Sequence, residues 1–294
     1  GTAEGRCEPG EKPGEFAVPA AVAMSSACYA TQPHHSGVCD TELTGMVETG
    51  HGNFKGLYPP TFYATMSVFV GDDVERSVLV MRAFNVLLAV ALVTVLYVLL
   101  EVRLRAPLVW GLALTVVPMG MFPVVSVNPS GWAILSAATL WIALWGYFSA
   151  PTIGRRIGLA SIALVSAVLG AGSRGDSAPY VAFGAVIACI PSFERSKRWR
   201  LLALLPASIL AIGFAFYLSS GQVDSALAGE MAGDPPESVD LLSGFLRTMI
   251  QIQGLWVGNF GLQDLGWGDT KMPAVVWVTT MTIFSGVCFY ALSL

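Results

Sequence analysis

The sequence has few charged residues, and this scarcity excludes most soluble folds. Asp, Glu, Lys and Arg make up 12% of its 294 residues, about half of the ~25% that is usual for soluble domains. Hydrophobic residues make up 54%, and the mean hydropathy is +0.63. The chain therefore lacks the polar surface of a soluble enzyme or a disordered chain. It has 16 basic and 20 acidic residues, and this negative net charge does not suit a protein that binds nucleic acid. We conclude that it is an integral membrane protein.

Strand-like alternation and internal repeats are also absent, which favours helices over a membrane β-barrel. Crossing ~30 Å of hydrocarbon takes a helix of roughly 17 to 25 apolar residues. The sequence predicts an all-α, polytopic bundle of about seven transmembrane helices, with kinks at Pro118, Pro123 and Pro206. The predicted runs are 81–100, 106–125, 131–149, 157–173, 177–193, 201–219 and 273–294.

The basic residues are concentrated in three short loops, which predicts the orientation of the bundle. Loops rich in Lys and Arg face the cytoplasm. The loops that follow the first, third and fifth runs hold eight of the 16 basic residues: Arg103, Arg105, Arg155, Arg156, Arg195, Lys197, Arg198 and Arg200. Residues 1–80 and 220–272 are therefore expected to lie outside the cell membrane.

This orientation divides the chain into four parts. They are an extracytoplasmic segment at 1–80, a six-helix region at 81–219, a second extracytoplasmic segment at 220–272 and a seventh helix at 273–294. Apolar residues between 239 and 250 follow helical spacing, which predicts an amphipathic interfacial helix. Nothing before residue 80 resembles a signal peptide, so we expect an upstream span and interpret the chain as a fragment.

The outer cysteines predict a disulfide rather than a metal site. Cys28 and Cys39 flank a short loop on the oxidising side, which suits a disulfide between them and leaves Cys7 without an assigned partner. Zinc binding by these cysteines with His34, His35 or His51 is the alternative. Their spacing matches no zinc signature well, so we expect neither a metal nor another cofactor.

Charged residues mark the outer ends of the predicted spans. Arg174 and Asp176 stand between two short apolar runs, where charges usually pair or face a watery cavity. In a purely structural interpretation Asp176 caps the next helix and Arg174 extends to the interface. Asp269 and Lys271 occupy a Gly- and Trp-rich segment before the last run. We expect these four residues to approach one outer cavity.

Two further outer segments allow a structural and a functional interpretation. Asn128 precedes Pro129 in a tight turn, where it suits a helix cap or a substrate contact. The segment Tyr58-Pro59-Pro60-Thr61-Phe62-Tyr63 suits a rigid interfacial anchor or one wall of a groove for a lipid substrate.

Together these segments resemble a known family. The motifs are Tyr58-Pro59-Pro60, Asn128-Pro129-Ser130-Gly131, Ser173-Arg174-Gly175-Asp176 and Gly266-Trp267-Gly268-Asp269-Thr270. Over essentially the whole chain they resemble the multi-pass family catalogued as domain of unknown function 2142. That family is similar in layout to the C-type glycosyltransferases, which transfer a sugar from a polyprenyl-phosphate donor on the outer face. The acidic catalytic motif of those enzymes follows a first span that this chain does not contain.

The resemblance implies a role in cell-envelope polysaccharide synthesis. A carboxylate, with Asp176 and Asp269 as candidates, would deprotonate a hydroxyl of the polysaccharide acceptor. Arg174 or Lys271 would stabilise the departing lipid phosphate, and Asn128 would contact the substrate. The alternative is a non-enzymatic transporter or an assembly component of polysaccharide export, although transporters more often carry broken helices and charges at the midplane.

The predicted orientation can be tested by labelling single cysteines in intact cells. In a background without the five native cysteines, Gly233→Cys should react with a membrane-impermeant maleimide, and Ser196→Cys should react only after the cells are opened. Labelling of Ser196→Cys in intact cells would reverse the orientation.

Overall fold

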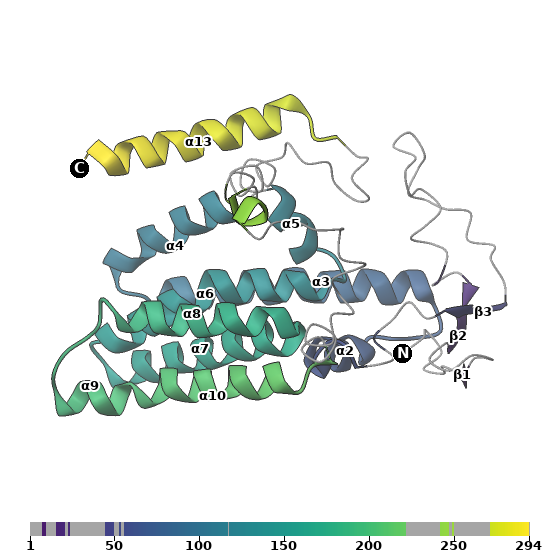
Figure 1. Ribbon diagram of the computed structural model, residues 1–294, viewed down its shortest axis with the longest axis horizontal. Coiled ribbons are helices and arrows are strands. Elements are labelled where there is room, and N and C mark those ends of the chain that lie inside the picture. Colours follow the sequence, from purple (N-terminus) through teal and green to yellow (C-terminus); the bar gives the residue numbers. More distant parts are fainter. Residues whose placement is uncertain are drawn as a thin grey trace.

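The protein is mostly helical, with its long helices aligned in one bundle (Figure 1). The computed structural model describes residues 8–9, 16–20, 23, 45–49, 53, 56–116, 118–221, 242–246, 249 and 271–293. Helices α6, α7 and α8 pack together, α10 lies against α7 and α8 at one edge, α3 runs along the bundle, and α13 lies apart from these helices, on the side of α4 (Figure 1). Cys7, Cys28 and Cys39 lie outside the described residues, so their predicted pairing stays a prediction.

Five stretches are long and apolar enough to cross a membrane, and they confirm five of the seven predicted runs. One of the five consists of two consecutive helices, α9 and α10, with a single residue between them. The stretches are α3 (Val74–Leu99), α6 (Pro129–Ser149), α7 (Ile153–Ser173), α9 (Lys197–Leu202) with α10 (Leu204–Leu218), and α13 (Ala274–Ser293).

The other two runs are not shown as complete spans. The run at 106–125 is divided into α4 (Val102–Thr115) and α5 (Pro118–Val124). Proline has no N–H and suits the first turn of a helix better than its interior, so Pro118 begins a new helix where a kink was predicted. The run at 177–193 forms α8 (Ala178–Cys189), whose 12 residues span about 18 Å. That length is too short to cross the hydrocarbon.

Small residues let α6 and α7 pack closely at the centre. Ala143 on α6 and Ala163 and Ala167 on α7 are fully buried. The Oγ1 atom of Thr139 lies 2.8 Å from the Oγ atom of Ser166, which joins the two helices by a hydrogen bond inside the core. Close approach of small side chains is the usual way in which helices associate where water provides no driving force.

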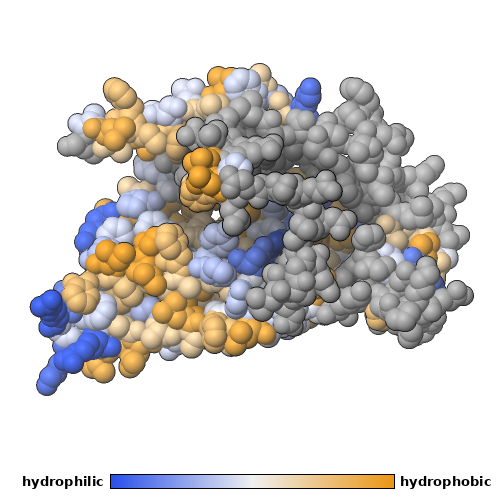
Figure 2. Space-filling view, viewed as in Figure 1, coloured by the Kyte–Doolittle hydropathy of each residue, from blue (hydrophilic) through white to orange (hydrophobic). Residues whose placement is uncertain are grey.

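The bundle has two chemically different ends. The three basic loops, at residues 100–105, 150–156 and 190–200, lie together at one end, which we call the basic end. There Phe148 stacks on Trp199 with ring centroids 6.2 Å apart, and the Tyr147 hydroxyl donates to the Leu202 carbonyl at 3.3 Å. Figure 2 shows hydrophilic side chains at this end, next to α9, and hydrophobic ones along the helices. This shared location is what the predicted orientation requires.

The opposite end contains structure that the sequence did not predict. We call it the hairpin end; it comprises residues 56–73, 125–131 and 170–178. The segment before the first span includes α2 (Pro60–Ser67), which packs against α7. Phe62 of α2 is 2% exposed and meets the Trp132 ring edge-on, with centroids 5.1 Å apart.

The N-terminal segment also contains strands, so the fold is not all-α. Strands β1 (Glu8–Pro9), β2 (Phe16–Pro19) and β3 (Met46–Thr49) form an antiparallel sheet in the order β1-β2-β3. In β2 and β3, Phe16 pairs with Thr49 and Pro19 with Met46. The amphipathic helix expected at 239–250 is described only at 242–246 and 249, where the backbone is helical.

Gly170 provides a test of the packing between α6, α7 and α8. A Cβ atom at this position would overlap the side chain of Ser136 and lie 2.7 Å from Cγ2 of Val181. Gly170→Ala should therefore lower the free energy of unfolding by about 1–3 kcal/mol. Gly154→Ala, in the same helix with nothing within 4 Å, is the matched control and should cause no loss. Thermal unfolding in detergent measures both, and equal midpoints for the two variants would contradict the packing.

Candidate functional site

Three segments that are far apart in the sequence meet at the hairpin end. They contribute Tyr58, Ser130 and Arg174, and each comes from one of the motifs on which the family resemblance depends. The fourth motif, at 266–270, lies outside the described residues. The structure thus brings together three of the four motifs that were identified separately in the sequence.

The connection between α7 and α8 is a short hairpin closed by serine hydroxyls. Helix α7 ends at Ser173, and the 3₁₀ turn η2 (Gly175–Ser177) leads directly into α8. The Ser173 hydroxyl donates to the Gly170 carbonyl at 2.9 Å. The Ser177 hydroxyl is shared between the carbonyls of Gly170 and Arg174. Because these bonds satisfy carbonyls that a helix end leaves without partners, the backbone around Arg174 is fixed.

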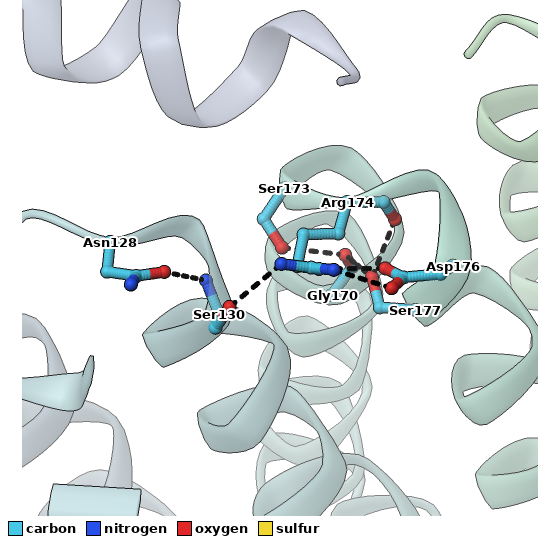
Figure 3. A network of polar contacts seen from close by, with 7 residues as sticks. All are labelled: Asn128, Ser130, Gly170, Ser173, Arg174, Asp176 and Ser177. Atoms are coloured by element: carbon cyan, nitrogen blue, oxygen red, sulfur yellow. Dashed lines mark hydrogen bonds and ion pairs between the residues drawn. The ribbon is translucent and has the colours of Figure 1, made fainter. Parts of the chain in front are cut away.

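The guanidinium of Arg174 is held on two sides by hydrogen bonds (Figure 3) and on a third side by an aromatic ring. Its Nε donates to Oδ1 of Asp176 at 2.8 Å, and its Nη2 donates to Oδ2 at 2.6 Å. Its Nη1 donates to the Ser130 hydroxyl at 3.0 Å. The guanidinium carbon also lies 5.5 Å from the ring centroid of Tyr58, within the range of a cation–π interaction. The side chain of Arg174 remains 27% exposed.

Asn128 holds the turn that presents Ser130. Its side-chain oxygen accepts from the backbone N–H of Ser130 at 2.9 Å and caps α6, which confirms the capping interpretation (Figure 3). A Cβ atom at Gly131 would overlap the backbone of Pro123, so the turn is packed tightly against the end of α5. Asn128 therefore supports Arg174 through Ser130, and its predicted contact with substrate stays a prediction.

Tyr58 is fixed by an asparagine side chain. The Asn53 oxygen accepts from the Tyr58 N–H at 2.8 Å, and the Asn53 amide donates to the Tyr58 carbonyl at 3.0 Å. The neighbouring Tyr63 lies with its ring centroid 6.2 Å from that of Tyr58. Burial raises the pKa of Tyr63, Tyr58 adds to this, and Arg174 opposes it. The wall beside the guanidinium is thus aromatic and partly dehydrated.

The ion pair between Arg174 and Asp176 indicates that Asp176 positions the arginine. The hydrogen bond from Arg174 lowers the pKa of Asp176, partial burial opposes this, and the charge of Arg174 lowers it further. The same hydrogen bond raises the pKa of Arg174. A carboxylate with a lowered pKa and both oxygens occupied is a weak general base, whereas it is well suited to fixing the direction of a guanidinium.

A second polar cluster at this end was not predicted. Asn85 of α3 is 3% exposed; its amide donates to the Ser126 carbonyl at 2.7 Å, and its oxygen accepts from Nε1 of Trp132 at 3.0 Å. Arg82 donates to the Val125 carbonyl at 3.3 Å. The sequence does carry a signal for this cluster, since Asn85 lies within an apolar run and buried polar groups in a membrane need partners. The cluster fixes α3 against the turn that carries Asn128.

The remaining predicted residues are not joined to this network by the described contacts. Lys271 is exposed just before α13, and Asp269 lies outside the described residues, so their approach to a common cavity stays a prediction. Among the residues that the structure describes, no group of three or more His, Cys, Asp or Glu could hold a metal ion.

An apolar groove begins beside the hairpin. It runs between α8 and α10, has a volume of about 370 Å³, and starts at Ala178, two residues after Asp176. It is lined by small residues, Ala182 and Gly213, and by larger ones such as Phe214. The groove therefore extends from the first turn of α8, next to the hairpin, along α8 and α10.

The comparisons with known proteins identify a family and no characterised relative. A family model described as "Predicted membrane protein (DUF2142)" matches residues 4–294. Neither a curated protein nor a solved structure matches the chain.

The lowered pKa of Asp176 predicts a pH-dependent contribution to stability. Because the pKa is lower in the folded state, the pair stabilises the fold above the ordinary aspartate pKa, 3.8, and this contribution disappears as the pH falls through the lowered value. Asp176→Asn should cost at most about 1 kcal/mol at neutral pH, since the carboxylate is half exposed. Thermal unfolding measures this effect as the difference in midpoint between Asp176→Asn and the unmodified chain. That difference should become smaller in acid, and a difference that grows on acidification would contradict the ion pair.

Proposed function

The chain belongs to the DUF2142 family of predicted membrane proteins, and on this premise we propose that the hairpin end binds a polyprenyl-phosphate-linked sugar. The reaction is the transfer of that sugar on the outer face of the membrane to a polysaccharide acceptor of the cell envelope. The protein is then an enzyme similar to the C-type glycosyltransferases.

The observation that carries this proposal is the fixed, partly exposed guanidinium of Arg174. Arginine suits phosphate oxygens because its planar donors match their geometry. Asp176 and Ser130 orient the group through bonds of 2.6–3.0 Å, and Tyr58 covers one face. An arginine held in this way needs no reorganisation when a phosphate binds, which favours stabilisation of charge that develops during a reaction.

The apolar groove between α8 and α10 supports a lipid as the carrier of the phosphate. A phosphate at Arg174 would place the attached chain near Ala178, where the groove begins. Pockets that take hydrophobic ligands are lined by apolar side chains with few polar groups at one end. The groove and the guanidinium together match a molecule with a long apolar chain and an anionic head.

The proposed chemistry assigns separate roles to the residues. The acceptor hydroxyl gives its proton to a carboxylate, the new glycosidic bond forms, and the bond between the sugar and the lipid phosphate breaks. Arg174 stabilises the negative charge on the departing phosphate. Asp176 positions Arg174, Asp269 is the candidate base in this chain, and Lys271 is a second candidate cation.

The alternative function is a non-enzymatic transporter or assembly component of polysaccharide export. A transporter would place charged groups at discontinuous helices near the midplane. In the described spans, the polar pair at the centre of α6 and α7 is the neutral Thr139 and Ser166. The ion pairs Arg174–Asp176 and Arg103–Glu101 lie at the two ends of the bundle. This distribution favours chemistry at the membrane surface.

Binding of polyprenyl phosphate to the chain in nanodiscs tests the proposal. Native mass spectrometry should show stronger binding of the phosphate than of the neutral polyprenol. Arg174→Gln should reduce this preference at least about tenfold, because a charged hydrogen bond contributes about 1.5–3 kcal/mol. Arg174→Lys should retain part of it, since the charge remains and the fork of donors does not.

Arg76→Gln is the matched control, because Arg76 is an exposed cation near the same end of the bundle. It should leave the preference unchanged, and equal losses in Arg76→Gln and Arg174→Gln would refute the site. Transfer of labelled sugar from the donor to an acceptor then separates the two functions. Binding that depends on Arg174 without any transfer by the parent protein would favour the export component.

A further inference from the structure

The basic end contains a polar pocket that the proposed function does not use. It has a volume of about 230 Å³ and lies between the end of α6, the loop at 190–196 and the start of α9. The lining residues are Phe148, Ser149, Ser192, Glu194, Arg198, Trp199 and Leu202. The pocket is therefore built by three segments of the bundle and is separate from the hairpin end.

Two buried hydrogen-bond donors in this pocket lack a partner. The Ser192 hydroxyl and the Trp199 indole N–H are both buried, and neither forms a hydrogen bond with another described residue. Leaving such a group unsatisfied destabilises the fold, whereas a ligand that supplies the acceptor removes this cost. Tryptophan N–H groups are donors without any acceptor capacity, so the molecule that satisfies Trp199 must present an acceptor.

The charges around the pocket favour an anion. Arg198 lines it, and Arg195, Lys197 and Arg200 lie in the same short segment. Within the described part of the chain, none of these four cations forms an ion pair. Glu194 also lines the pocket and opposes an anion there, but residues 194–200 carry four positive charges against this one negative charge. The net positive charge and the two hydrogen-bond donors therefore both favour a ligand with negatively charged oxygen atoms.

The surroundings of the pocket favour a lipid over a soluble anion. Phe193 is 59% exposed and meets the Trp199 ring edge-on at 5.0 Å. Ile190 and Leu201 are each 69% exposed. Exposed apolar side chains beside a basic pocket suit a molecule whose phosphate enters the pocket while its acyl chains remain in the membrane.

We propose that the pocket at Ser192, Arg198 and Trp199 binds the phosphate of an anionic phospholipid. Such pockets between helices on the cytoplasmic side of membrane proteins take acidic head groups. The lipid accepts hydrogen bonds from Ser192 and Trp199, and Arg198 neutralises it. This bound lipid joins α6 to α9 at the end of the bundle opposite the site of the proposed reaction.

The test measures binding of phosphatidylglycerol and phosphatidylcholine to the full chain by native mass spectrometry. Phosphatidylglycerol should bind in preference. Arg198→Gln should reduce this preference about tenfold because it removes the cation, and Trp199→Phe should weaken phosphatidylglycerol binding about tenfold because it removes a donor to the phosphate. Trp199→Phe keeps an aromatic ring against Phe148 and Phe193, and the unfolding midpoint without added lipid checks that the variant is folded.

Matched variants separate a site from a general charge effect. Arg200→Gln removes the same charge from outside the pocket and should change the preference less than about twofold. Glu194→Gln should strengthen phosphatidylglycerol binding, since it removes the opposing charge. Equal effects of Arg198→Gln and Arg200→Gln, or weaker binding by Glu194→Gln, would overturn the proposal. Equal competition by soluble glycerophosphate would show that the pocket takes free phosphate, which would also overturn it.

Discussion

The guanidinium of Arg174 is the group on which the arrangement of the hairpin end depends. It connects the hairpin between α7 and α8 with the turn before α6 through Ser130 and with the segment before α2 through Tyr58. A charge at the edge of a membrane needs partners, and Asp176 provides both oxygens of its carboxylate. The same bonds that satisfy the arginine therefore fix the relative positions of three segments.

Close helix packing gives this end a rigid base. Gly170 allows Ser136 and Val181 to approach α7, and Gly172 brings Thr61 of α2 against the last turn of the same helix. The ends of α6, α7 and α2 are thus set by small residues only a few positions from Arg174. At the basic end, Trp199 contacts Phe148 and Phe193, and these aromatic contacts hold the end of α6, the loop before α9 and α9 together. One end is therefore organised by the Arg174–Asp176 ion pair and the other by aromatic contacts.

The sequence predicted features that depend on local composition and missed those that depend on distant contacts. Apolar runs identified five spans, and the position of Asn128 before Pro129 identified a helix cap. The pairing of Arg174 with Asp176 follows from their separation by one residue. The division at Pro118 was missed because a proline can either kink a helix or begin one, and surrounding packing decides which.

Distant partners could not be predicted because they require the fold. Nothing near Ser130 in the sequence indicates that its hydroxyl receives a hydrogen bond from a residue 44 positions away. The same holds for Asn85 and Trp132, which lie 47 positions apart. The small sheet was missed because β1 and β2 are very short, with two and four residues. Asp269, Cys28 and Cys39 lie outside the described residues, and their assigned roles stay predictions.

Photo-crosslinking tests the central claim, that the hairpin end receives the phosphate of a lipid, most directly. A polyprenyl phosphate with a photoreactive group beside its phosphate would be added to the protein in nanodiscs, and labelled peptides would be mapped by mass spectrometry. If a lipid phosphate binds at the hairpin end, labels will fall within 58–63, 128–131 and 170–178 and will be lost when unlabelled polyprenyl phosphate is in excess. Labelling confined to residues 190–202, or labelling at the hairpin end that an excess of unlabelled lipid does not reduce, would contradict it.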